Sequence, residues 1–166
     1  SIGNSAFSGT GLTSMVFNAT NCPTASFSNI STLTSVTIGS GVKVLPSYFI
    51  SGCSNVKSIT IPSNVTSIGN SAFSGTGLTS IYVPSSVTAI SDNMFSNCSN
   101  LASVILPSSL TTIGTSAFAY CSSLPSITIP SNVTSIGNSA FSGTGLTSME
   151  LNATNCPTAS FSNIST

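Results

Sequence analysis

Large apolar residues recur along this chain at intervals of 20 to 23 residues. The main column consists of Phe7, Phe27, Ile50, Phe73, Phe95, Phe118, Phe141 and Phe161. Further columns occupied by Leu, Ile, Val and Met keep the same period. A fixed period of this length is typical of a solenoid, in which each repeat forms one coil and buries its apolar face against the neighbouring coils. The pattern predicts about seven stacked coils.

Each coil follows the pattern L-x-S-I-x-I-P-S-x-V-x-x-I-x-x-x-A-F. The S-I-x-I piece alternates with a period of two and predicts a short strand with one face inward. Proline ends four of these strands, at Pro62, Pro84, Pro107 and Pro130. We expect V-x-x-I to turn the far side and S-A-F to form a helical or 3₁₀ turn. The prediction is therefore a β-rich solenoid over residues 1–166, one domain, with a parallel sheet on one face and short turns or 3₁₀ segments on the other.

Some of the copies are literal. The segment Ser58–Ser80 is identical to Ser126–Ser148, and Ser1–Thr32 returns as Ser135–Thr166 with changes at two positions only. Near each end a shorter coil reads N-A-T-N-C-P-T-A-S-F and lacks the V-x-x-I piece, which leaves its far side undetermined. A free solenoid needs polar capping units for solubility. Because none is recognisable, we expect the chain to be an excerpt of a longer array.

The composition restricts the partners. Hydrophobic residues make up 40% of the chain and charged residues 2%, against about 25% charged in an average soluble domain. The four charges, Lys43, Lys57, Asp92 and Glu150, cancel, and serine and threonine exceed a third of the chain. Without a basic stripe we expect no nucleic-acid partner. No apolar run approaches the roughly 18 residues of a membrane span, so we expect none in this segment.

Catalytic constellations are missing from the sequence. There is no histidine, and Asp92 and Glu150 lie more than two coils apart, so no acid–base pair forms. The G-T-G turns lack the lysine of a phosphate-binding loop. The five cysteines follow the repeat register and so form a line, whereas a zinc site needs converging ligands. We expect a protein that is not an enzyme and that holds no metal or cofactor.

The cysteines share one column of the repeat. Cys53, Cys98 and Cys121 each lie three residues after the large apolar position, and Cys22 and Cys156 are equivalent to each other in the shorter coils. We interpret them as small buried thiols. A disulfide between Cys98 and Cys121 remains open, although side chains stacked in parallel are poorly placed for one.

Seven sequons of the N-x-S/T type occur, at Asn18, Asn29, Asn64, Asn97, Asn132, Asn152 and Asn163. They fall at two recurrent places, the corner after the first strand and the turn after the large apolar residue. If the chain is exported by a eukaryotic cell, we expect N-glycosylation at several of them. The alternative is an unglycosylated chain whose corners favour asparagine.

Outward positions of the predicted strands form two rows, one of serine and one of mixed character. The mixed row supplies the candidate binding face, Thr37, Thr60, Tyr82, Ile105 and Thr128. Solenoids commonly bind through this sheet, and Tyr82 with Ile105 is the best contact pair because tyrosine is enriched at interfaces. A solvated sheet without a ligand is an equally open interpretation.

The unit SITIPSNVTSIGNSAFSGTGLTS, together with SVILPSSLTTIGTSAFAYCSSL at Ser103–Leu124, resembles the BspA-like class of leucine-rich repeats. The resemblance implies an extracellular or cell-surface location. It also implies non-enzymatic adhesion through host, matrix or cell-surface proteins or glycans. An alternative is a structural segment of a glycosylated extracellular fibre, in which coils of different copies self-associate end to end. The near-identical ends favour this second hypothesis.

Overall fold

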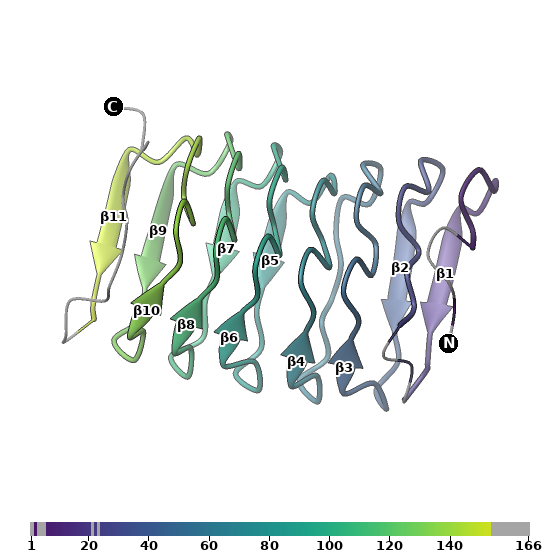
Figure 1. Cartoon of the computed structure of the whole chain (residues 1–166), viewed down its shortest axis with the longest axis horizontal. Helices are drawn as coiled ribbons and strands as arrows, with labels where there is room; N and C mark the ends of the chain where they lie inside the picture. Colours follow the sequence, from purple (N-terminus) through teal and green to yellow (C-terminus); the bar gives the residue numbers. More distant parts are fainter. Residues whose placement is uncertain (1, 3–5, 21, 23, 154–166) are drawn as a thin grey trace.

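The computed structural model describes residues 2, 6–20, 22 and 24–153. It confirms the predicted solenoid, with coils stacked along the long axis of the molecule (Figure 1). Each coil is named here after its residue in the main apolar column. One side, the long-strand face, is formed by β1 (Ser14–Phe17), β2 (Ser35–Ile38), β5 (Ser80–Tyr82), β7 (Ser103–Ile105), β9 (Ser126–Ile129) and β11 (Ser148–Leu151). Their apolar side chains alternate inward, as the S-I-x-I pattern predicts.

A second row of strands, the short-strand face, lies where the sequence predicted only a turn. The V-x-x-I pieces form β3 (Val44–Leu45), β4 (Ser67–Ile68), β6 (Ala89–Ile90), β8 (Thr112–Ile113) and β10 (Ser135–Ile136). In each of them the second residue is buried. The Phe27 coil has no such strand among its described residues, in keeping with its missing V-x-x-I piece.

The third side, called the Phe side, contains the apolar column. The expected helical or 3₁₀ turn is wrong, because the described residues contain neither element. Instead, from the Ile50 coil to the Phe141 coil, the residues two before and two after the column residue have left-handed φ angles, as at Ser71 (57°) and Gly75 (66°) around Phe73. This geometry turns the backbone N–H of Phe73 toward the next coil, where it donates to the carbonyl oxygen of Met94 at 3.1 Å.

The Phe side forms a ladder that continues from coil to coil. From the Ile50 coil to the Phe141 coil, each junction has three such backbone hydrogen bonds, made by the column residue and its two left-handed neighbours. The strands pair in parallel but in separate groups: β1–β2, β5–β7 and β9–β11 on one face, β3–β4 and β6–β8–β10 on the other. Within the described residues, the Phe side alone has no interruption over these coils.

Aromatic side chains fill the core beneath the Phe side. Phe73, Phe95, Phe118 and Phe141 stack with ring centroids 5.6, 5.4 and 5.5 Å apart and interplanar angles of 13°, 13° and 2°. All four rings are buried. Ile50 interrupts the column, and the neighbouring Phe49 packs edge-on against the rings of Phe17 and Phe27. Stacked aromatic pairs add about 0.5–1.5 kcal/mol each beyond the burial of their area.

Hydroxyl and amide side chains connect the coils where other proteins use charges. Thr111 Oγ1, for example, donates to the carbonyl oxygen of Thr88 at 3.0 Å. No strand pair joins the Phe73 coil to the Phe95 coil. There the hydroxyl of Ser91 donates to the carbonyl oxygen of Ile68. Every buried side-chain nitrogen or oxygen of the described residues has a hydrogen-bond partner. The abundance of serine and threonine therefore has a structural explanation.

Candidate binding face

The long-strand face carries the outward row that the sequence singled out. The structure exposes all five candidates, Thr37, Thr60, Tyr82, Ile105 and Thr128. Tyr82 on β5 lies directly opposite Ile105 on β7, and their exposed fractions are 60% and 56%. These two large side chains form a solvent-facing apolar pair among hydroxyl groups.

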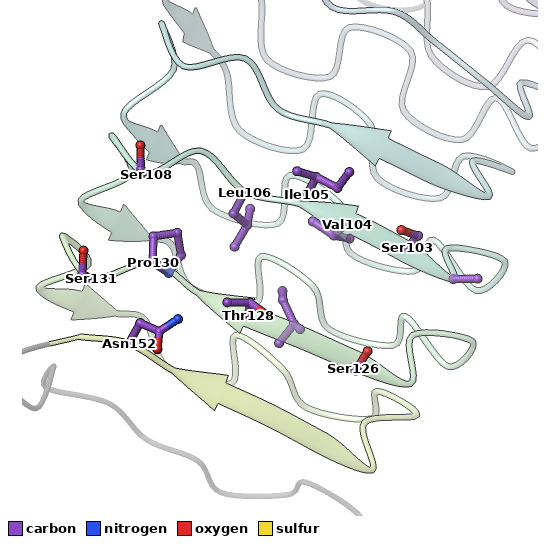
Figure 2. Close-up of a pocket in the computed structure, with 12 residues that line it drawn as sticks. Ser103, Val104, Ile105, Leu106, Ser108, Ser126, Thr128, Pro130, Ser131 and Asn152 are labelled. Carbon is purple, nitrogen blue, oxygen red and sulfur yellow. The ribbon is translucent and has the colours of Figure 1, made fainter.

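A groove opens next to this pair, between β7 and β9 (Figure 2). These neighbouring strands belong to different sheets, and the groove between them has a volume of about 630 Å³. Val104, Ile105 and Leu106 line its middle, and serine side chains lie at both ends of the strands (Figure 2). Repeat analysis missed this groove because a regular ladder would leave no gap between adjacent coils.

A smaller groove occurs three coils earlier along the solenoid. It lies between β2 and residues 58–62 and has a volume of about 370 Å³. Thr37 and Thr60 line it. Residues 58–61 form no strand, although the identical letters of β9 do. Both grooves therefore border an S-I-T-I-P segment, one of the literal copies in the sequence.

The charged side chains do not assemble into a reactive site. Glu150 Oε2 accepts a hydrogen bond from Thr128 Oγ1 at 3.1 Å, and Asp92 Oδ1 accepts one from the backbone N–H of Thr115 at 2.7 Å. Both carboxylates thus accept hydrogen bonds that join neighbouring coils. In the described part of the chain, no three His, Cys, Asp or Glu side chains come together where they could hold a metal ion. The same residues include no helix with the length and apolar character to cross a membrane.

The column of cysteines lies behind the Phe side and faces the core. Cys53, Cys98 and Cys121 are buried free thiols. Each thiol donates to the carbonyl oxygen of an aromatic residue in the preceding coil, with sulfur–oxygen distances of 3.2, 3.1 and 3.1 Å. Burial raises the pKa of all three. Cys22 is also free and half-buried, and Cys156 lies outside the described residues.

The same column contains threonine in the coils that read S-G-T-G. Thr76 is buried, and its hydroxyl lies 3.3 Å from the sulfur of Cys98 in the next coil. It also donates to the carbonyl oxygen of Phe73 at 2.8 Å. Cysteine and threonine thus perform the same task, which is to supply a small side chain that satisfies a backbone carbonyl.

The sequons lie at corners and turns, as the repeat predicts. Five of them are exposed, at Asn18, Asn29, Asn97, Asn132 and Asn152. Asn64 is half-buried, and its amide donates to the carbonyl oxygen of Val42; Asn163 lies outside the described residues. Asn29 and Asn97 have φ angles of 59° and 61°, which asparagine tolerates better than most residues. Asparagine is thus favoured there with or without a glycan, and glycosylation stays a prediction.

Comparison with known proteins places this geometry among leucine-rich repeats. A leucine-rich repeat protein from Bacteroides ovatus superposes with a TM-score of 0.71 and 27% identity over 87% of this chain and 43% of its own. A leucine-rich cell surface protein from Faecalibacterium prausnitzii gives 0.59 and 27% over 87% of this chain and 48% of its own. The chain therefore spans less than half the length of each relative.

No curated protein matches the chain. The family model described as the BspA-type leucine-rich repeat region matches residues 1–102 and 88–166, in six copies. These two ranges overlap and together cover the sequence from end to end. The chain thus belongs to the family of BspA-type leucine-rich repeat proteins.

Proposed function

We propose that this chain is an extracellular, cell-surface binding module without catalytic activity, which recognises its partner through the long-strand face. The observation that supports this proposal most directly is the exposed pair of Tyr82 and Ile105 on adjacent strands. The partners are proteins or glycans of a host, a matrix or another cell. The F. prausnitzii relative, described as a cell surface protein, supports the location.

The chemistry of the face supports binding by contact rather than by long-range attraction. Apolar area removed from water contributes about 25 cal/mol per Å², and tyrosine is enriched among residues that dominate binding energy. The chain has no net charge, so its field does not steer a charged partner. We therefore expect an affinity that depends little on salt.

A non-catalytic role agrees with how the polar groups are used. The two carboxylates hold backbone or hydroxyl donors of neighbouring coils, and the buried thiols bond to carbonyl oxygens. Neither arrangement offers a nucleophile beside a general base, which is the minimum for covalent catalysis.

The test compares two faces of the molecule. Tyr82→Ser and Ile105→Ser remove the pair, and Val44→Ser is the matched control on the short-strand face, where Val44 is also exposed. Binding to immobilised extracellular matrix proteins is measured by surface plasmon resonance. We expect the affinity to fall about tenfold or more for the pair and less than about twofold for the control. Equal losses, or none, would contradict the proposal.

A second candidate is a structural segment of a glycosylated fibre. Its support is the return of Ser1–Thr32 as Ser135–Thr166, together with the four-residue parallel pairing of β1 and β2. Coils of two copies that stack in this way would repeat the contacts seen within one chain. Electron microscopy of the purified chain tests the idea, since discrete solenoids at high concentration would contradict it. An intact mass that does not change on glycosidase treatment would refute glycosylation.

A further inference from the structure

The groove between β7 and β9 has an ordered distribution of side chains (Figure 2). Ser103 and Ser126 lie at one end of the two strands, and Ser131 and Asn152 lie at the other. Apolar side chains, including the half-buried Leu106, lie between them. The volume of about 630 Å³ falls within the roughly 300–1,000 Å³ of small-molecule sites. The groove thus offers hydrogen-bonding ends and an apolar middle.

An added peptide strand does not fit between β7 and β9. Cα atoms of the two strands approach within 8 Å of each other. A strand inserted between them would need two ladder spacings, about 9.6 Å. A ligand must therefore lie on the groove and contact side chains, rather than join the ladder through backbone hydrogen bonds.

The charges and polar groups narrow the class of ligand further. None of the residues that line the groove is ionisable. The nearby Glu150 carboxylate is already hydrogen-bonded to Thr128. A charged ligand would find no opposite charge, and a hydrocarbon would leave the serine hydroxyls without partners, each at a cost of about 1–3 kcal/mol. The remaining class is a neutral molecule that carries hydroxyl groups around an apolar surface.

We propose that this groove binds neutral carbohydrate, with sugar hydroxyls at the serine and Asn152 ends and the C–H face of a ring on Ile105 and Leu106. The inference rests on the proposed function, which it deepens by naming a ligand class. Tyr82, opposite Ile105, adds an exposed aromatic ring on β5, across β7 from the groove. Rigid aromatic side chains provide contact area at low entropic cost.

The second groove extends the proposal to a polymer. It borders Ser58–Pro62, which has the same letters as Ser126–Pro130 beside the larger groove. The two sites are three coils apart, about 14 Å at about 4.8 Å per coil. A glycan that occupies both gains avidity because the second contact becomes intramolecular. We expect longer neutral oligosaccharides to bind more tightly than short ones of the same sugar.

The experiment is a glycan array of neutral and acidic oligosaccharides, followed by calorimetric titration with the strongest neutral binder. Ser126→Trp fills the larger groove, and Ser67→Trp is the control, because Ser67 is exposed on the short-strand face and lines neither groove. Asn152→Ala tests the polar end without adding volume. Thermal unfolding checks that each variant is folded. We expect at least tenfold weaker binding for Ser126→Trp, several-fold weaker for Asn152→Ala, and no change for Ser67→Trp.

Three outcomes would overturn the proposal: no neutral oligosaccharide binds, Ser126→Trp binds as well as the parent, or acidic glycans are preferred. The failure of this inference and the failure of the proposed function are distinguishable. If Tyr82→Ser abolishes binding to an enzymatically deglycosylated matrix protein while no neutral oligosaccharide binds, the carbohydrate inference fails and the binding face stands. If neither ligand binds, both fail.

Discussion

The Phe side and the long-strand face differ in how neighbouring coils are joined. On the Phe side, three backbone hydrogen bonds cross every junction from the Ile50 coil to the Phe141 coil, and four phenylalanine rings stack behind them. On the long-strand face, the strands pair two by two, and grooves open where the pairing stops. The comparison separates a side that holds the coils together from a side with free surface.

The difference has a physical origin in the residues themselves. Left-handed φ angles, adopted by glycine, asparagine, serine or tyrosine two residues from the column residue, direct several N–H groups toward the same neighbouring coil. A β-strand instead alternates its donors between its two neighbours. A lost neighbour therefore costs a strand only part of its hydrogen bonds, and the face tolerates a gap.

The largest expected effect comes from the centre of the aromatic stack. Phe95 is fully buried between the rings of Phe73 and Phe118. We expect Phe95→Ala to lower the free energy of unfolding by about 3–5 kcal/mol, because it removes apolar contact and leaves a cavity. Ile105→Ala on the long-strand face should change it by less than about 0.5 kcal/mol. Urea titrations followed by circular dichroism would reveal the difference, and similar losses would break the comparison.

A smaller effect is expected from the left-handed positions. Asn97 has a φ of 61° and donates its backbone N–H to the carbonyl oxygen of Ala119. We expect Asn97→Val to destabilise the fold by about 1–2 kcal/mol, since a β-branched residue is strained in this region. Asn97→Gly, which is compatible with the same angle, should be close to neutral. A valine variant as stable as the glycine variant, by thermal melting, would count against the proposed origin of the ladder.

The buried thiols predict a graded effect of alkaline pH. Burial raises the pKa of Cys98, so above about pH 8.5 the unfolded chain releases a proton that the folded chain retains. The stabilisation is complete below that pH and is lost as the pH rises toward the folded pKa, by about 1.4 kcal/mol per pH unit for each buried cysteine. Cys98→Ala should reduce the slope measured by urea titration between about pH 8 and pH 10. An unchanged slope would show that the thiol is accessible to water.

Much of the fold could be predicted from the sequence, because the repeat restates each position several times. The inward positions of the strands and the column of phenylalanines follow directly from the period. The prediction of a helical or 3₁₀ turn was wrong, because the spacing of apolar residues does not distinguish such a turn from one built on left-handed φ angles. The signal was present, however, in the Gly or Asn that follows Phe by two positions, as in Gly75 and Asn97.

The grooves could not be predicted, because they depend on the neighbouring coil rather than on the amino-acid sequence of the strand segment itself. Ser58–Ile61 and Ser126–Ile129 are identical in sequence, yet only the second forms a strand, paired with β11. Strand formation is thus decided by the coil alongside, which a single repeat does not encode. The candidate row was identified, but the hollow beside Ile105 was not.

One consequence of the continuous ladder is mechanical. Backbone hydrogen bonds join the coils without interruption along the Phe side but only in pairs along the long-strand face. The Phe side is therefore the stiffer side of the stack. If the molecule bends about the Phe side, the spacing between strands of the long-strand face changes far more than the spacing between the phenylalanine rings. Tension or curvature imposed on the whole array would therefore alter the width of the grooves, and the mouth of a binding site would respond to load while the core stays intact.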